Sequence, residues 1–168
     1  HHISETEHVS FGLTVWAPTG DYDSSNLANL SLNKWTFIPT VSYTKIFAGP
    51  NIEFSATLGV HLSTENHDTD YQDGVLTDFE FTVIKRFGNG FGFGVIGSWI
   101  EQLSEDEGGS ADVLGGLEGR AFGAGPIVTY STKIGDQSLD FNARWVHEFE
   151  NRKRLEGDLF ALGASFKF

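Results

Sequence analysis

Apolar and polar residues alternate along most of the chain. The clearest stretch covers residues 52–63, where nearly every second residue is apolar and the residues between are polar or glycine. Successive side chains of a β-strand point to opposite faces of a sheet, so this pattern predicts a strand with one apolar and one polar face. No stretch shows the 3.6-residue period of an amphipathic helix as clearly. The alternation therefore predicts an all-β chain.

About eight segments of this kind have the length of a tilted membrane-spanning strand, which is about 9–11 residues. They are residues 8–17, 35–46, 52–63, 75–87, 91–103, 121–132, 138–148 and 160–168. The chain has no run of about 18 or more apolar residues, the length that a membrane-spanning helix needs. Strands cross a membrane with all their backbone groups paired only when they close into a barrel.

The connections between these segments alternate between short and long. The short ones, residues 47–51, 88–90 and 133–137, contain the glycine typical of hairpin turns. The long ones are the polar stretches 18–34, 64–74, 104–120 and 149–157. The acidic residues at 104–112 predict that the third of these is a solvated, mobile loop. Outer-membrane barrels have short periplasmic turns and long outer loops. We therefore predict that residues 1–168 form one antiparallel transmembrane β-barrel domain of the outer-membrane type, located in the bacterial outer membrane.

A water-soluble lipid-binding barrel is an alternative with the same alternation, because its apolar face points inward. Its outer face would be rich in lysine and glutamate, whereas the polar face here consists mostly of Gly, Ser and Thr with scattered charges, as in a wet barrel interior. The net charge of −12 disfavours nucleic acid as a partner. The expected partners are membrane lipid and lipopolysaccharide, the barrel-insertion machinery and a small-molecule solute, and we expect a monomer.

Charged and polar residues on the predicted inner face are the candidates for lining a pore. They are Glu53, His61, Asp78, Glu80, Arg86, Asp140, Asn142, Arg144 and Lys167. In a wide barrel they would face a water-filled path and select solutes, whereas in a narrow barrel of eight strands they would form an interior network of salt bridges and hydrogen bonds. The sequence leaves both possibilities open.

Acidic and aromatic residues recur in the first two long loops. They are Asp21, Tyr22 and Asp23 in the first loop, and Asp68, Asp70 and Tyr71 in the second. Such residues suit the vestibule of a channel or a divalent-cation site, but aspartates also shape turns and tyrosines pack loops together. No stretch has the spacing of an EF-hand, and we predict no metal site.

The last predicted strand ends in aromatic residues, with Phe166 and Phe168 on its apolar side. We interpret these two residues as the signal that the barrel-insertion machinery reads. An enzyme is the remaining class, since His61 and Ser63 share one face, but alternation alone produces such pairs and no nucleophile motif accompanies them. We therefore predict no catalytic residues and no cofactor.

Three motifs carry a family resemblance: Pro-Thr-Gly-Asp-Tyr-Asp at 18–23, Thr-Asp-Tyr at 69–71, and Glu-Gly-Asp at 156–158 before the terminal aromatic strand. Together they resemble the Gram-negative outer-membrane channels labelled as transporters of the MetA pathway of phenol degradation. The resemblance implies a channel for passive uptake of small hydrophobic or aromatic molecules. It also implies a barrel of about twelve strands, so we expect this chain to lack about four N-terminal strands. A closed barrel with a structural or surface-binding role is the alternative.

Overall fold

The computed structural model describes residues 1–114, 116 and 118–167. These residues form nine strands and one short helix. The elements are β1 (His2–Ser4), β2 (Glu7–Trp16), β3 (Thr36–Phe47), β4 (Ile52–Ser63), β5 (Leu76–Arg86), β6 (Phe91–Gln102), α1 (Gly109–Leu114), β7 (Arg120–Ile134), β8 (Gln137–Arg152) and β9 (Asp158–Lys167). None of the described helical residues belongs to a helix with the length and apolar character needed to cross a membrane.

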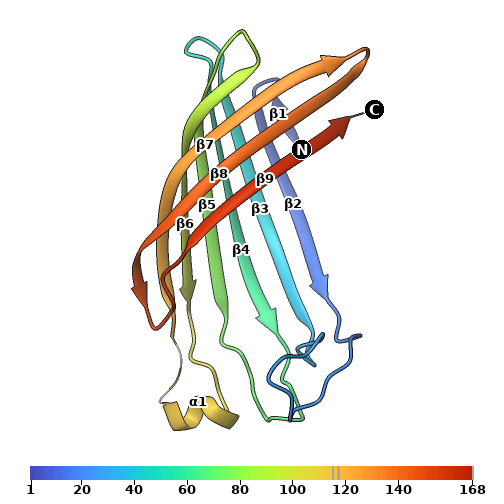
Figure 1. The fold of residues 1–168 in the computed structure, drawn as a ribbon, viewed down its shortest axis with the longest axis vertical. Helices are drawn as coiled ribbons and strands as arrows, with labels where there is room; N and C mark the ends of the chain where they lie inside the picture. The colour runs from blue at the N-terminus through green and yellow to red at the C-terminus, as the bar shows by residue number, and fades with distance from the viewer. Residues whose placement is uncertain (115, 117, 168) are drawn as a thin grey trace.

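All nine strands belong to one antiparallel sheet, in which each strand pairs with its neighbours in the sequence (Figure 1). The pairing keeps apolar positions in line across the sheet. Val41 of β3 lies opposite Leu58 of β4, and Leu58 lies opposite Phe79 of β5. Since side chains alternate along each strand, this register gives the sheet one continuous apolar face. The predicted all-β antiparallel fold is confirmed.

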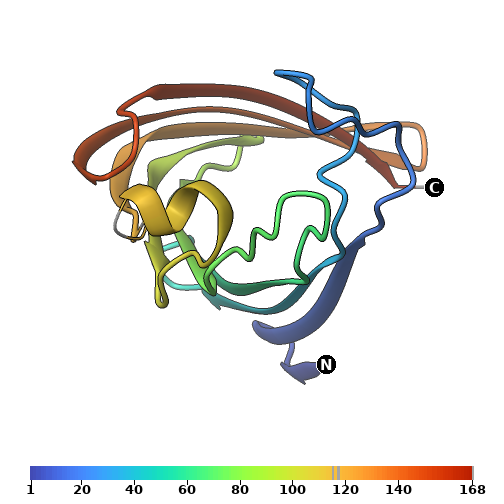
Figure 2. The same ribbon diagram turned by 90° about the horizontal axis from the view of Figure 1, so that it is seen from below.

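The sheet curls until β7, β8 and β9 form one wall and β2, β3 and β4 form the opposite wall (Figure 2). The apolar face is on the convex side of this curl, and the face with the predicted polar positions is on the concave side. Within the described residues, β1 and β9 are the edges of the sheet and do not pair with each other. The structure is therefore an open, curled sheet, whereas the sequence predicted a closed barrel.

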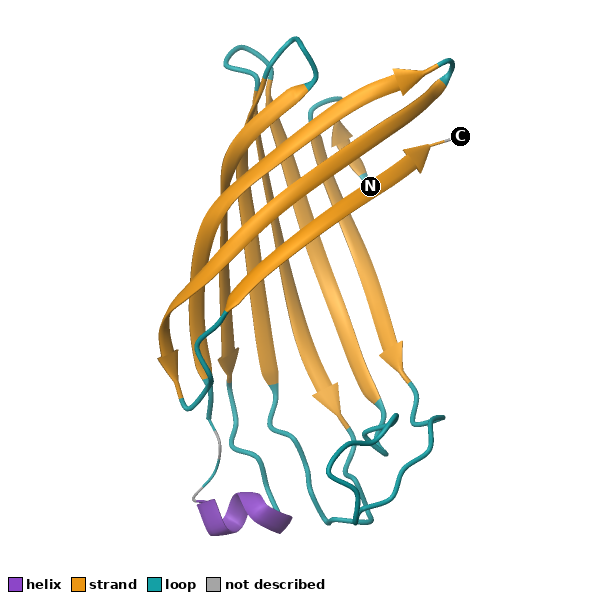
Figure 3. Cartoon of the chain, in the orientation of Figure 1, coloured by secondary structure: helices purple, strands orange, loops and turns teal. Residues whose placement is uncertain are grey.

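The long loops and α1 lie at one end of the strands, and the short turns lie at the other (Figure 3). We call these the loop end and the turn end. Seen from the loop end, α1 and the loop between β4 and β5 lie over the space that the sheet surrounds (Figure 2). The predicted alternation of short and long connections thus places all long loops on one side.

Glycines on the concave face allow the sheet to bend sharply between β5 and β8. A Cβ atom on Gly94 of β6 would overlap the backbone oxygen of Val83, and a Cβ atom on Gly125 of β7 would overlap the backbone oxygen of Trp145. Backbones approach this closely only where no side chain intervenes. The abundance of glycine within the strands is thereby explained for this part of the sheet.

The same bend encloses a small apolar core on the concave face. It consists of Ile84, Ile96, Ile127 and Val146, one residue from each of β5, β6, β7 and β8. Ile96 is only 1 % exposed. The residues before and after each of these four in its strand point to the convex face. The core therefore occupies positions at which the sequence pattern predicted a wet interior.

The elements differ from the predicted ones in three places. The structure has nine strands rather than about eight because β1 adds a short strand beside β2. Helix α1 lies within the predicted loop 104–120, and its six residues are too few to show a helical period. Strand β8 continues to Arg152, into the predicted loop 149–157. A bulge at Phe149 shifts its register between Phe122 and Gly123 of β7, and the pairing continues beyond it.

Candidate functional site

One ion pair and one histidine–carboxylate contact join β4 and β5 on the concave face. The Nε atom of Arg86 donates a hydrogen bond to Glu53 at 2.8 Å, and Nε2 of His61 lies 2.7 Å from a carboxylate oxygen of Asp78. Asp78 is directly opposite Gly59, which has no side chain, so its carboxylate has room to turn toward His61. The structure thus brings four of the candidate pore-lining residues together as two side-chain pairs.

Another ion pair crosses the space inside the curl. Arg144 of β8 donates to Glu80 of β5 at 3.1 Å, although β6 and β7 separate these strands in the sheet. In a flat sheet, strands three positions apart lie about 14 Å from each other. The curl is therefore what makes this contact possible. The Nε atom of Arg144 is buried and has no hydrogen-bond partner among the described residues.

The remaining candidates on the concave face are not joined to these pairs. Asp140 accepts a hydrogen bond from the Ser131 hydroxyl at 2.5 Å, and Asn142 lies opposite Gly163 of β9; both side chains are exposed. The side chain of Lys167 lies outside the described part of the structure. All three positions lie near the turn end of β8 and β9, away from the bend.

A cavity of about 340 Å³ is lined by residues of β5, β6, β8 and β9. Asp78 and Glu80 line it from β5, and Val146 and Glu148 line it from β8. Val146 also belongs to the apolar core. The interior of the curl is thus divided into a packed apolar part and a hollow part with acidic residues. The sequence did contain a signal for the packed part, because Ile84 and Ile96 occupy polar-face positions in the alternation.

Hydrogen bonds connect the first two long loops at the loop end. The side chain of Asn66 donates to the Tyr22 hydroxyl, and the side chain of Asn33 donates to Asp68, each at 2.9 Å. Asn66 is one of the few buried polar residues, at 7 % exposed. The structure therefore brings Tyr22 and Asp68 together through two asparagines that the sequence pattern gave no reason to select.

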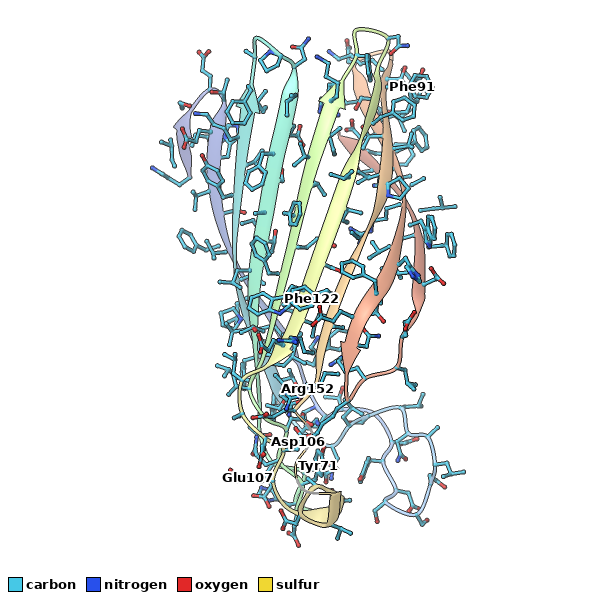
Figure 4. All side chains as sticks on the ribbon, turned by 90° about the vertical axis from the view of Figure 1, so that its left-hand side faces the viewer. Tyr71, Phe91, Asp106, Glu107, Phe122 and Arg152 are labelled. Carbon is cyan, nitrogen blue, oxygen red and sulfur yellow. The ribbon has the colours of Figure 1, made fainter. Side chains whose placement is uncertain are left out.

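Asp106 connects the second and third long loops. It accepts hydrogen bonds from the Tyr71 hydroxyl at 2.5 Å, from the Gln102 side chain at 2.6 Å and from the Gly74 backbone N–H at 2.7 Å (Figure 4). Burial raises the pKa of the Tyr71 phenol, and the hydrogen bond to Asp106 raises it further. The sequence predicted a solvated, mobile loop around Asp106; its side chain is half-buried and accepts three hydrogen bonds.

The other acidic loop residues shape the loops in which they lie. Asp23 accepts hydrogen bonds from the hydroxyl and the backbone N–H of Ser25, and these bonds lower the pKa of its carboxyl group. Asp70 takes a left-handed backbone conformation with φ of 49°, and Asp21 is exposed. Among the residues that the structure describes, no group of three or more metal-ligating side chains occurs. This geometry matches the turn-shaping interpretation of the acidic motifs.

The convex face carries large apolar side chains that the rest of the described chain leaves exposed. Phe11 is 78 % exposed, and other exposed residues of this face are Leu13, Phe37, Leu58, Phe93, Val95, Phe160, Leu162 and Phe166. Aromatic pairs lie near both ends: Phe91 with Tyr130 at the turn end, and Trp99 with Phe122 toward the loop end (Figure 4). Phe168 lies outside the described residues.

An antiparallel sheet with an apolar convex face, ion pairs on its concave face and long loops at one end defines the class as a β-barrel-like protein. The family model described as "Putative MetA-pathway of phenol degradation" matches residues 1–163, and the chain belongs to this family. The suspected family resemblance is confirmed. No curated protein and no solved structure matches the chain.

Proposed function

We propose that the chain forms the wall of a β-barrel in the bacterial outer membrane and admits small hydrophobic or aromatic molecules by passive diffusion. The observation that carries the proposal is the contrast between the two faces. The middle of the convex face exposes large apolar side chains, and its charged residues, such as Glu7, Lys45 and Asp158, lie at the strand ends. The concave face carries the Glu80–Arg144 ion pair in the middle of its strands. Water strongly disfavours so extensive an exposed apolar band, and lipid accommodates it.

The aromatic pairs near both ends of the convex face support the same placement. Aromatic side chains of membrane barrels concentrate at the two membrane–water interfaces, where one edge of the ring meets lipid and the other meets head groups. In this placement the long loops face outward and meet lipopolysaccharide, the turns face the periplasm, and Phe166 contributes to recognition by the insertion machinery. The protein acts as a monomer.

In the proposed mechanism the solute enters between the loops and passes along the concave face, and the chain performs no chemistry on it. Aromatic solutes are favoured because the family's description refers to phenol degradation. The ion pairs leave few unpaired charges along this route, which suits uncharged molecules. No cofactor or energy source takes part.

A closed barrel with a structural or surface-binding role is the second candidate. Two observations favour it: the apolar core of Ile84, Ile96, Ile127 and Val146, and the Glu80–Arg144 ion pair that crosses the interior. Both fill space through which a solute would pass. The two candidates therefore differ in whether the interior conducts.

Uptake of the hydrophobic dye N-phenyl-1-naphthylamine by Gram-negative cells separates the candidates, because an intact outer membrane slows its entry. We expect expression of the wild-type chain to speed the rise in dye fluorescence. A bulky residue on the concave face, Ser55→Trp, should reduce the effect, whereas the neighbouring convex variant Ala56→Trp should not. Equal outer-membrane levels are checked by immunoblotting. Slow uptake with all three proteins present in the membrane would favour the closed barrel.

A further inference from the structure

We infer that a pocket at the loop end of the concave face binds one small, uncharged, apolar ring. The pocket has a volume of about 430 Å³ and lies between the ends of β2 and β3 and the first long loop. Its apolar lining comes from Trp16, Leu30, Leu32 and Ile38. The inference rests on the proposed function, because it names the first binding position on the proposed route of the solute.

Strand register places the tryptophan on the concave face. Trp16 lies opposite Thr36, and Ile38 two residues further along β3 lies opposite Thr14. These side chains share the face of Thr14 and Thr36, whereas Val15 points to the convex face. The proposed lipid contact accounts for the apolar residues of the convex face, but not for Trp16, which lies on the opposite face. Its large apolar surface is 65 % exposed toward the pocket and solvent.

The first long loop completes the pocket from the other side. Leu30 and Leu32 line it, and both side chains are exposed although they are large and apolar. The backbone between them is held in place, because Ser31 is buried and accepts a hydrogen bond from the Asn33 N–H at 3.0 Å. The side chain of Asn33 in turn donates to Asp68 of the second loop. A held loop thus presents two leucines toward an exposed tryptophan.

The lysine and the histidine of the lining already have partners. Lys34 forms an ion pair with Asp73, and Nε2 of His61 lies within hydrogen-bond distance of Asp78. An anionic ligand would have to compete with Asp73 for Lys34, and a cationic ligand would be repelled by Lys34. An uncharged molecule avoids both costs while it covers the apolar lining. The volume lies at the lower end of the range for small-molecule pockets, which is about 300–1,000 Å³, and suits a single ring.

Quenching of tryptophan fluorescence tests the inference on the purified protein in detergent micelles. Nitrobenzene is the neutral probe, and 4-nitrobenzoate is the same ring with a negative charge. We expect nitrobenzene to quench in a saturable manner and 4-nitrobenzoate to give no saturable component. The saturable part should disappear in Trp16→Phe and persist in Trp145→Phe, because Trp145 lies on the convex face.

Variants of the lining test the site without removing the reporter. Leu32→Ala and Ile38→Ala should each raise the dissociation constant for nitrobenzene about tenfold, since each removes several buried methylene or methyl groups from the contact. Leu62→Ala, on the convex face next to His61, should leave it unchanged. Circular dichroism confirms that each variant is folded.

Three results would overturn the inference: saturable quenching that persists in Trp16→Phe, equal affinities in the lining and convex variants, or equal binding of the charged probe. The outcome is separate from that of the proposed function. Saturable binding at Trp16 together with slow dye uptake by cells would retain the pocket and reject the channel. Fast dye uptake without saturable quenching would retain the channel and reject the pocket.

Discussion

The concave face of the sheet differs between its two sides, although the same alternating pattern builds both. From β5 to β8, glycines without side chains let the strands bend closely around Ile96, and an apolar core fills the space there, next to the cavity that Glu80 and Val146 line. From β2 to β4, small hydroxyl side chains pair across neighbouring strands, as Ser42 does with Thr57 and Thr44 with Ser55, each at 2.9 Å. This side is gently curved and leads to the pocket at the loop end.

The difference shows that alternation decides which face a residue occupies but not whether that face encloses space. Glycine brings the opposing backbones together, and a branched apolar residue then fills what remains. Serine and threonine hydroxyls form hydrogen bonds with each other along the sheet surface, and these short side chains extend little into the interior. A lumen thus depends on the size of the inner residues as much as on their polarity.

The largest effect is expected in the packed side. Ile96→Ala should lower the free energy of unfolding by about 2–5 kcal/mol, because it leaves a cavity among Ile84, Ile127 and Val146. Val95→Ala is the matched control, since Val95 is the preceding residue of β6 and points to the convex face. Guanidinium unfolding of the protein in detergent micelles measures both. Similar losses of unfolding free energy in the two variants would mean that the inner core stabilises the fold no more than the convex face does.

Next in size is the glycine effect. Gly125→Ala should destabilise the fold by about 1–3 kcal/mol, because the added Cβ atom would overlap the Trp145 backbone oxygen and force β7 away from β8. Gly49→Ala in the turn between β3 and β4 is the control, as nothing lies within 4 Å of its added Cβ. The same unfolding experiment applies. A tolerated Gly125→Ala would remove the proposed cause of the sharp bend.

A smaller effect is expected for the ion pair that connects the two sides. Glu80→Gln, Arg144→Gln and the double variant should give a coupling free energy of about 0.2–1 kcal/mol, because both side chains remain partly exposed. A coupling of zero would show that the pair does not hold β5 against β8. The Glu53–Arg86 pair on adjacent strands provides a comparison that does not depend on the curl.

The smallest effect concerns pH and the loops above the open side. Since the pKa of Tyr71 is raised in the folded protein, the phenol stays protonated there when the unfolded chain ionises near pH 10. Its contribution to stability is fully present below about pH 10 and decreases as the pH rises above that value. The unfolding midpoint of the wild type should therefore fall between pH 9 and 11 more than that of Tyr71→Phe. Parallel curves would contradict the assignment.

The sequence predicted the strands, their faces and the alternation of short and long connections, because these depend on neighbouring residues in the chain. It did not predict that Ile84 and Val146 would belong to one core, since that requires the curl of the sheet from β5 to β8. It also placed Tyr22, Asp68 and Tyr71 at the loop end without their partners. Asn66 binds Tyr22, Asn33 binds Asp68, and Asp106 binds Tyr71, each across loops. No periodic pattern marks residues that act at such separations in the chain.

The central claim, that the convex face meets lipid and the concave face meets water, is best tested by cysteine labelling, because the chain has no native cysteine. Single cysteines are placed along β4 at Ser55 and Thr57 on the concave face and at Ala56 and Leu58 on the convex face. In outer membranes, a water-soluble maleimide should label Ser55→Cys and Thr57→Cys and leave Ala56→Cys and Leu58→Cys unlabelled. Labelling of the convex pair in place of the concave pair would contradict the claim.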